Sequence, residues 1–153
     1  MTTTDDVRAR TWRPFGARLM ATVLGAMLLV LVLVVWLTWS DHVRAAFTFG
    51  QRATLFLLGL GAFACWFAIM RSRVTADENG MTVVNGYRRR AFEWSQVVGI
   101  NLRRGAPWAG VDLSDGTSVS LFAIQGSDGQ RAIRAVRELR ALVEKHTPSD
   151  HDG

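Results

Sequence analysis

The pattern of hydrophobic positions separates the chain into two unlike parts. Residues 19–40 and 53–70 contain no charged side chain, and neither stretch has a polar face at helical spacing. As helices they would extend about 33 Å and about 27 Å at ~1.5 Å per residue, close to the ~30 Å core of a bilayer. A helix that is apolar on every side is typical of a lipid environment. The pattern predicts two transmembrane helices, 19–40 and 53–70, joined by a short extracytoplasmic loop, 41–52.

Two other interpretations of these stretches are less favoured. Two core helices of a soluble domain would need a chain large enough to bury them on all sides, and 153 residues do not provide it. A cleaved signal peptide would have a shorter apolar run and a small-residue cleavage site, but no clear A-x-A motif follows the first stretch. We therefore expect a retained helical hairpin.

Beyond Met70 the hydrophobic pattern changes to alternation, which is typical of half-buried β-strands. Turn signals separate the alternating runs, and Asn85-Gly86 is the strongest because both residues tolerate the positive φ of a tight hairpin. Alternation in the third run places Arg88, Arg90, Phe92 and Trp94 on one face. The expected strands are 73–77, 81–85, 88–94, 96–104, 108–113 and 117–123.

A last change of period predicts a C-terminal helix. Between residues 130 and 145, Ala132, Val136, Leu139 and Val143 recur at helical spacing with charged side chains between them. The polar residues 147–153 are expected to form a disordered tail. The predicted fold class is a membrane α-helical hairpin followed by an α+β domain, residues 71–146, in which six or seven short antiparallel strands precede a capping helix.

The average composition hides this division. The chain is 49% hydrophobic and carries a formal net charge of +5, values that would suit an ordinary small soluble protein. The single cysteine, Cys65, allows no intramolecular disulfide and no cysteine-rich zinc site. Every basic residue except Lys145 is arginine, and this usage indicates a GC-rich bacterium such as an actinobacterium.

The placement of arginine predicts the orientation of the two spans. Residues 1–18 contain four arginines, and Arg71 and Arg73 follow the second span at once, whereas the loop contains only Arg44 and Arg52. Basic residues near the ends of spans favour the cytoplasmic side. We expect a multi-pass protein of the bacterial plasma membrane, with a cytoplasmic N-terminal segment, 1–18, and both termini in the cytoplasm.

The order of elements after the spans resembles that of a bacterial pleckstrin-homology (PH) domain. The resemblance runs from about residue 73 to residue 146. It rests on the strand-turn-strand VTADENGMTV, a third strand ending in Phe92-Glu93-Trp94, the following SQVVGINL, and the hairpin VDLSDGTSVSLFA. With its two spans, the chain is most similar to the actinobacterial low molecular weight protein antigen 6 family. The resemblance implies a PH-like split β-barrel that the C-terminal helix caps at one end.

The resemblance does not extend to a known ligand site. Eukaryotic PH domains bind phosphoinositides through basic residues around the first hairpin loop, but here that loop, Asp77-Glu78-Asn79-Gly80, is acidic. A shared fold does not by itself imply a shared function. The resemblance therefore does not imply inositol phosphate binding.

Two groups of arginine, Arg88-Arg89-Arg90 and Arg103-Arg104, are the candidate interaction residues. If adjacent strands bring them together, they form a basic patch near the membrane, where anionic headgroups attract each arginine by about 1 kcal/mol. Contact with anionic lipid, contact with a protein partner, and a solvated strand face that obeys the positive-inside rule all stay open. Nucleic acid is not an expected partner, because acidic residues intersperse the region and no aromatic stacking platform is evident.

The sequence contains no pattern for catalysis, metal binding or cofactor binding. Asp112 and Asp115 lie at a predicted hairpin turn, where a turn role is favoured over acid–base chemistry. The three histidines are scattered without ligand spacing. Trp94 is expected to anchor the core, and Trp108, in a loop-like setting, to be the more exposed. No catalytic residue, metal ligand, cofactor or small-molecule substrate is predicted.

These observations favour a non-enzymatic, membrane-anchored PH-like binding or scaffold module. Its expected partner at the cytoplasmic face is a protein, anionic lipid, or a second copy of the chain. A small structural subunit of a larger membrane complex is the alternative, and the sequence does not separate the two. An enzyme is disfavoured, because the spans contain no polar residue beyond Thr, Ser and Cys65 from which to build a site.

Overall fold

The structure, a computed structural model, describes residues 9–146. These residues form two compact units, one of residues 9–16 with 71–146 and one of residues 17–70. The helical unit is therefore inserted in the sequence of a β-rich unit, which is built from segments on both sides of it. The predicted disordered tail, 147–153, lies outside the described residues.

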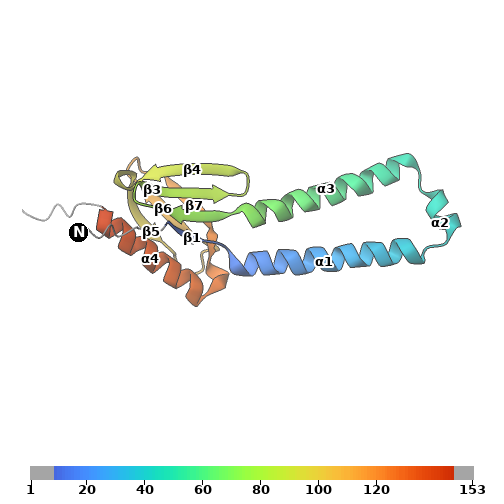
Figure 1. Ribbon diagram of the computed structural model, residues 1–153, viewed down its shortest axis with the longest axis horizontal. Helices are drawn as coiled ribbons and strands as arrows, with labels where there is room; N and C mark the ends of the chain where they lie inside the picture. Colours follow the sequence, from blue (N-terminus) through green and yellow to red (C-terminus); the bar gives the residue numbers. More distant parts are fainter. Residues whose placement is uncertain (1–8, 147–153) are drawn as a thin grey trace, which may run out of the picture. The chain divides into compact units, whose positions relative to one another are not determined.

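The helical unit consists of two long helices, α1 (Phe15–Thr38) and α3 (Phe49–Arg71), joined by the short helix α2 (Asp41–Ala46) (Figure 1). Both are long and apolar enough to cross a membrane, and neither has a buried side chain. Their 24 and 23 residues extend about 36 Å and about 35 Å at ~1.5 Å per residue. Both begin before the predicted spans, because arginine is a good helix former and does not end the helical backbone.

Two hydrogen bonds join α1 to α3 inside the helical unit. The indole Nε1 of Trp66 donates to Thr22 Oγ1 at 3.3 Å, and the guanidinium of Arg18 donates to the carbonyl oxygen of Met70. Each bond links one residue of α1 with one of α3. The two long helices therefore form a paired hairpin.

Aromatic rings gather where α1 leads into α2. Trp36, Trp39 and Phe47 have ring centroids 5.3–6.4 Å apart. Tryptophan at the end of a span is typical of the membrane–water interface, because the ring is apolar while its N–H requires a polar partner.

The β-rich unit contains two antiparallel sheets and a C-terminal helix (Figure 1). The strand order is β1-β2-β3-β4 in one sheet and β5-β6-β7 in the other. This arrangement confirms the predicted layout of two long apolar helices, PH-like sheets and a C-terminal helix. The elements are β1 (Arg10–Trp12), β2 (Arg73–Ala76), β3 (Gly80–Asn85), β4 (Arg88–Glu93), the 3₁₀ turn η1 (Trp94–Gln96), β5 (Val97–Asn101), β6 (Trp108–Leu113), β7 (Ser118–Gln125), the 3₁₀ turn η2 (Gly126–Asp128) and α4 (Gln130–His146).

The sequence does not predict strand β1, which precedes α1. It pairs antiparallel with β2, so that Trp12 lies opposite Val74 and Arg10 opposite Ala76. The Trp12 ring packs against the core, and its Nε1 donates to Glu138 Oε2 at 3.1 Å. The segment before the first long helix is therefore part of the β-rich unit, in addition to the predicted residues 71–146.

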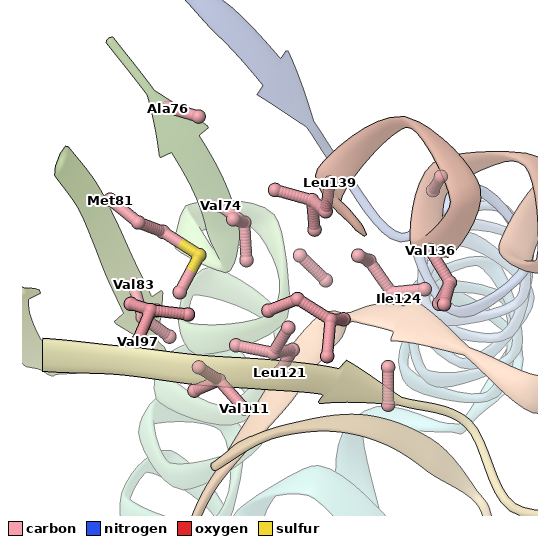
Figure 2. Packing of buried hydrophobic residues seen from close by; sticks show 14 of the residues in the cluster. Val74, Ala76, Met81, Val83, Val97, Val111, Leu121, Ile124, Val136 and Leu139 are labelled. Atoms are coloured by element: carbon pink, nitrogen blue, oxygen red, sulfur yellow. The ribbon is translucent and has the colours of Figure 1, made fainter. Parts of the chain in front are cut away.

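One face of each sheet and one stripe of α4 share a single core. In Figure 2, Val74 and Met81 from the first sheet, Leu121 from the second, and Leu139 from α4 converge. Leu121 and Leu139 have no exposed surface, and burying a side chain of this size contributes about 2 kcal/mol. The buried residues of α4 follow the predicted stripe: Ala132, Ala135, Val136, Leu139 and Val143.

Trp94 closes the core beside the C-terminal end of α4. Its side chain is 5% exposed, and its Nε1 donates to the carbonyl oxygen of Asp77 at 3.0 Å. Its ring stacks on His146 with 5.1 Å between centroids. The predicted role of Trp94 as a core anchor is confirmed.

Candidate functional site

Three hydrogen bonds mark the end of the β-rich unit at which the chain enters and leaves it. Ser72 Oγ accepts a hydrogen bond from the Gly86 N–H at 3.0 Å, so the β3–β4 turn lies beside the first residues after α3. The Asp128 carboxylate accepts from the N–H groups of Phe15 and Gly16 at 3.2 Å and 2.9 Å. Because β1 and β2 are antiparallel, the last residues of β1 and the first of β2 lie at this same end.

The candidate arginines lie in two elements that strand pairing does not join. Arg88, Arg89 and Arg90 begin β4, directly after the β3–β4 turn, and Arg103 and Arg104 lie in the loop between β5 and β6. All five are exposed. Strands β4 and β5 belong to different sheets, so the two groups do not form the patch on adjacent strands that the sequence suggested.

The two arginine groups nevertheless lie at the same end of the β-rich unit. The loop that holds Arg103 and Arg104 packs on η2, because the Gly126 N–H donates to the carbonyl oxygen of Pro107 at 2.9 Å. η2 in turn holds Phe15 through Asp128. Both arginine groups therefore border the residues that connect the β-rich unit to the long helices.

Strand register divides the first group between two faces of its sheet. Arg90 lies opposite Val83, which lies opposite Val74, and both valines are buried. Arg89 lies opposite Val84, which lies opposite Arg73. Alternation therefore places Arg88 and Arg90 on the face of Val74 and Val83, as predicted, and Arg89 on the other face.

Further arginines, which the sequence did not single out as candidates, lie at the same end. Arg131, in the first turn of α4, holds its guanidinium 4.0 Å from the centre of the Phe15 ring, a distance typical of a cation–π contact. We term this region the basic end. Its arginines are Arg13, Arg71, Arg73, Arg88, Arg89, Arg90, Arg103, Arg104, Arg131 and Arg134.

The opposite end of the β-rich unit is acidic. The Ser114 N–H donates to the carbonyl oxygen of Gln96 at 2.9 Å, which joins the β6–β7 turn to η1, and Trp94 joins η1 to the β2–β3 turn and to the end of α4. We term this region the acidic end. Its carboxylates are Asp77, Glu78, Glu93, Asp115 and Glu144, and two basic residues, Lys145 and Arg10, which is opposite Ala76, lie at the same end.

An exposed aromatic pair accompanies the arginines of the basic end. The rings of Trp108 and Phe122 lie 4.7 Å apart between centroids, and the two residues are 40% and 38% exposed. Asn85, at the end of β3, accepts a hydrogen bond from the Phe122 N–H at 3.1 Å and donates to the carbonyl oxygen of Ser120 at 2.6 Å. The prediction that Trp108 is more exposed than Trp94 is confirmed. The sequence does carry a signal for Phe122: it lies between the buried residues Leu121 and Ala123, so alternation places its side chain on the opposite, exposed face.

An open pocket of about 550 Å³ lies between the β5–β6 loop and the start of α4. Arg103 and Arg104 line it together with apolar and glycine residues, among them Leu102, Ile133 and Gly126. A Cβ on Gly126 would lie 2.4 Å from the carbonyl oxygen of Ala106, so only glycine permits this close packing of the loop on η2. The lining of the pocket therefore combines two arginines with apolar residues.

Asp112 and Asp115, for which a turn role is expected, accept hydrogen bonds from neighbouring residues. Ser118 donates to Asp112 at 2.5 Å, and with the hydrogen bond from Asn101 and the charge of Arg103 it holds the pKa of Asp112 below its ordinary value. Hydrogen bonds from the Thr117 hydroxyl and N–H likewise lower the pKa of Asp115, which shapes the β6–β7 turn. Among residues 9–146, no group of three or more His, Cys, Asp or Glu side chains is placed to hold a metal ion.

Comparisons with known proteins agree with this fold. The model of the family described as Bacterial PH domain matches residues 71–142. The uncharacterized protein Rv1417 of Mycobacterium tuberculosis is 29% identical over 102 residues, which cover 67% of this chain and 66% of that protein. Low molecular weight protein antigen 6 of the same species is 40% identical over 57 residues, 37% of this chain and 50% of that protein. No solved structure gives a significant match.

The likeness to antigen 6 also confirms the predicted family resemblance. The chain spans 66% of the length of the first relative and half of the second, so the likeness concerns the shared region. The match begins where α3 ends and runs into the last turns of α4. Residues 71–142 of the chain therefore match the bacterial PH domain family, and the fold agrees with that match.

Proposed function

We propose that this protein is a non-catalytic binding module, held at the cytoplasmic face of the bacterial plasma membrane by α1 and α3. Its PH domain would bind anionic lipid or a protein partner there. Bacterial PH domains are non-catalytic modules, and this supports binding rather than chemistry as the role of the domain. The observation that carries the proposal is the concentration of arginine at the end of the domain that continues into both apolar helices.

The pairing of β1 with β2 supports a hairpin with both termini on one side of the membrane. β1 precedes α1 and β2 follows α3, yet Trp12 and Val74 lie opposite each other in one sheet. Two crossings return the chain to the side from which it started, whereas a single crossing would separate these strands. The excess of arginine outside the 41–52 loop favours the cytoplasm as that side.

Thiol labelling of single-cysteine variants in intact cells tests this topology. In a Cys65→Ala background, His42→Cys reports on the loop and Ser114→Cys on an exposed turn of the PH domain. We expect a membrane-impermeant reagent to label residue 42 in intact cells, and residue 114 only after the cells are opened. Labelling of residue 114 in intact cells would overturn the cytoplasmic assignment.

Mild detergent extraction of the tagged full chain tests its role. Extraction as a single chain, or with lipid, agrees with a binding module. Recovery in a fixed ratio with other integral membrane proteins would instead favour the alternative, a structural subunit of a larger complex.

A further inference from the structure

We propose that the basic end of the PH domain rests on the anionic headgroups of the membrane that α1 and α3 cross, with the Trp108–Phe122 pair at the headgroup level. The inference rests on the proposed membrane anchoring and names the surface that the domain binds. The proposed partner of the basic end is an anionic lipid surface.

Charge polarity is the first argument. Arginines crowd the basic end, which also holds the carboxylate of Asp128, while the acidic end carries Asp77, Glu78 and Glu93 among others. A negatively charged leaflet attracts the first end and repels the second. The domain therefore has an electrostatically preferred orientation, with its arginines toward the lipid.

The positive-inside rule does not account for this polarity. That rule concerns basic residues within about 15–20 residues of the end of a span, and Arg103, Arg104, Arg131 and Arg134 lie farther along the chain. The fold brings them to the basic end through the bond between Gly126 and Pro107 and through the Asp128 contact with Phe15. The orientation of the spans therefore does not explain arginine at these positions, whereas attraction to anionic headgroups does.

The aromatic pair is the second argument. Trp108 and Phe122 expose large rings beside the β3–β4 turn, in which Tyr87 is 61% exposed. Exposed aromatic rings next to arginine are typical of the interfacial zone, where the ring meets acyl chains and polar groups stay in water. The pocket of about 550 Å³ that Arg103 and Arg104 line has room for a phosphodiester headgroup, and Leu102 and Ile133 also line it.

Chain connectivity supplies the third argument. Asp128 holds Phe15 and Gly16, the first two residues of α1, and Ser72, which accepts the hydrogen bond from Gly86, follows the last residue of α3. The basic end is therefore the end of the domain that the chain joins directly to both apolar helices.

Depth measurements on the full chain in vesicles test the inference. A spin label is attached, in a Cys65→Ala background, to Ser127→Cys at the basic end, Ser114→Cys at the acidic end, or Leu29→Cys within α1. Both serines are exposed and neither belongs to the aromatic pair. Vesicles contain phosphatidylcholine alone or an equal mixture with phosphatidylglycerol, and the readout is label relaxation by dissolved oxygen against a water-soluble nickel complex.

We expect the label at residue 127 to sit at headgroup depth in the anionic vesicles, with several-fold less exposure to nickel than the label at residue 114. Arg103→Gln with Arg104→Gln should return residue 127 toward the exposure of residue 114, and neutral vesicles should do the same. Arg137→Gln, an exposed arginine in the middle of α4, serves as the matched control and should change nothing.

The failures of the two proposals are distinguishable. If the label at residue 29 is deep but residue 127 is as aqueous as residue 114 in both vesicles, the basic end faces water and the lipid inference is overturned, which leaves the end open to a protein partner. If the label at residue 29 is itself aqueous, the membrane anchoring fails as well. Burial of residue 127 that the Arg103 and Arg104 substitutions do not change would overturn the electrostatic part of the inference.

Discussion

The carboxylate of Asp128 accepts a hydrogen bond of 2.9 Å from the backbone N–H of Gly16, a residue 112 positions earlier in the chain. The first N–H groups of a helix have no partner within the helix, and Asp128 provides one for both Phe15 and Gly16 in the first turn of α1. A carboxylate at this position also interacts favourably with the positive end of the helix dipole. A residue of the PH domain therefore acts as the N-cap of a helix that precedes the domain.

Asp128→Ala should destabilise the PH domain by about 1 kcal/mol, the usual cost of losing an N-cap side chain. Asp128→Asn should retain most of this stability, because the amide oxygen still accepts the hydrogen bonds. Urea unfolding of the full chain in detergent micelles measures the difference. Ser127→Ala is the neighbouring control and should leave the midpoint unchanged; equal effects of the two alanine substitutions would contradict the capping role.

Trp12→Ala tests whether β1 belongs to the PH domain. The partly buried indole packs on the core and donates to Glu138, so its loss should destabilise the domain by about 2 kcal/mol. Trp12→Phe keeps an aromatic ring but removes the N–H donor, and it should cost about 1 kcal/mol. The measurement is the free energy of unfolding. Thr11→Ala, exposed on the same strand, should have little effect. If Trp12→Ala leaves the free energy of unfolding unchanged, β1 does not stabilise the domain.

Gly80→Ala should destabilise the domain more than Gly116→Ala. A Cβ at residue 80 would lie 2.1 Å from the carbonyl oxygen of Phe92 on the paired strand β4, so the sheet itself would have to shift at a cost of about 3 kcal/mol. Gly116 has a φ of +81° and open space around it, so Gly116→Ala should cost only the conformational strain, about 1–2 kcal/mol. Thermal unfolding of the two variants gives the order, and the reverse order would refute the close approach at Gly80.

The stabilising effect of Asp112 should depend on pH. Its hydrogen bonds from Ser118 and Asn101 and the charge of Arg103 lower its pKa in the folded protein, so the folded state favours the ionised carboxylate. The stabilisation is complete above the ordinary aspartate pKa of about 3.9 and is lost as the pH falls through the lower pKa of the folded state.

Unfolding of the wild type and of Asp112→Asn at neutral pH, and in steps below about pH 4, measures this dependence. The difference between the two proteins should shrink as the pH falls. In a Ser118→Ala background the difference should be smaller at every pH, because Ser118 is the largest contributor to the lowered pKa. A difference that does not vary with pH would show that the charge of Asp112 contributes nothing.

Much of the fold follows from local patterns in the sequence. Alternation predicts the six strands that follow α3, and the spacing of Ala132, Val136 and Leu139 predicts which face of α4 is buried. Such patterns work because each element buries one face, and burial selects residues with the period of that element. Strand β1 has only three residues, too few to show a period, and its partner Val74 lies on the far side of the helical hairpin.

The candidate site shows the same division. The sequence identifies Arg88 to Arg90 and Arg103 with Arg104 as exposed basic groups, and alternation separates the faces of Arg89 and Arg90 correctly. It does not reveal that the two groups share an end rather than a sheet, because that depends on the packing of the β5–β6 loop on η2. It also does not reveal that Trp108 meets Phe122, since they lie on different strands.

By itself, therefore, the sequence determined the two apolar helices, the strand-rich domain with its C-terminal helix, and the likeness to bacterial PH domains, because these depend on composition and on short periods along the chain. The tertiary structure alone decided that residues 10–16 complete the domain, that Asp128 caps α1, and that the domain has a basic end and an acidic end. These features join residues far apart in the sequence. Which distant residues meet is set by the packing of the two sheets and α4 around one core, which no short period along the chain encodes.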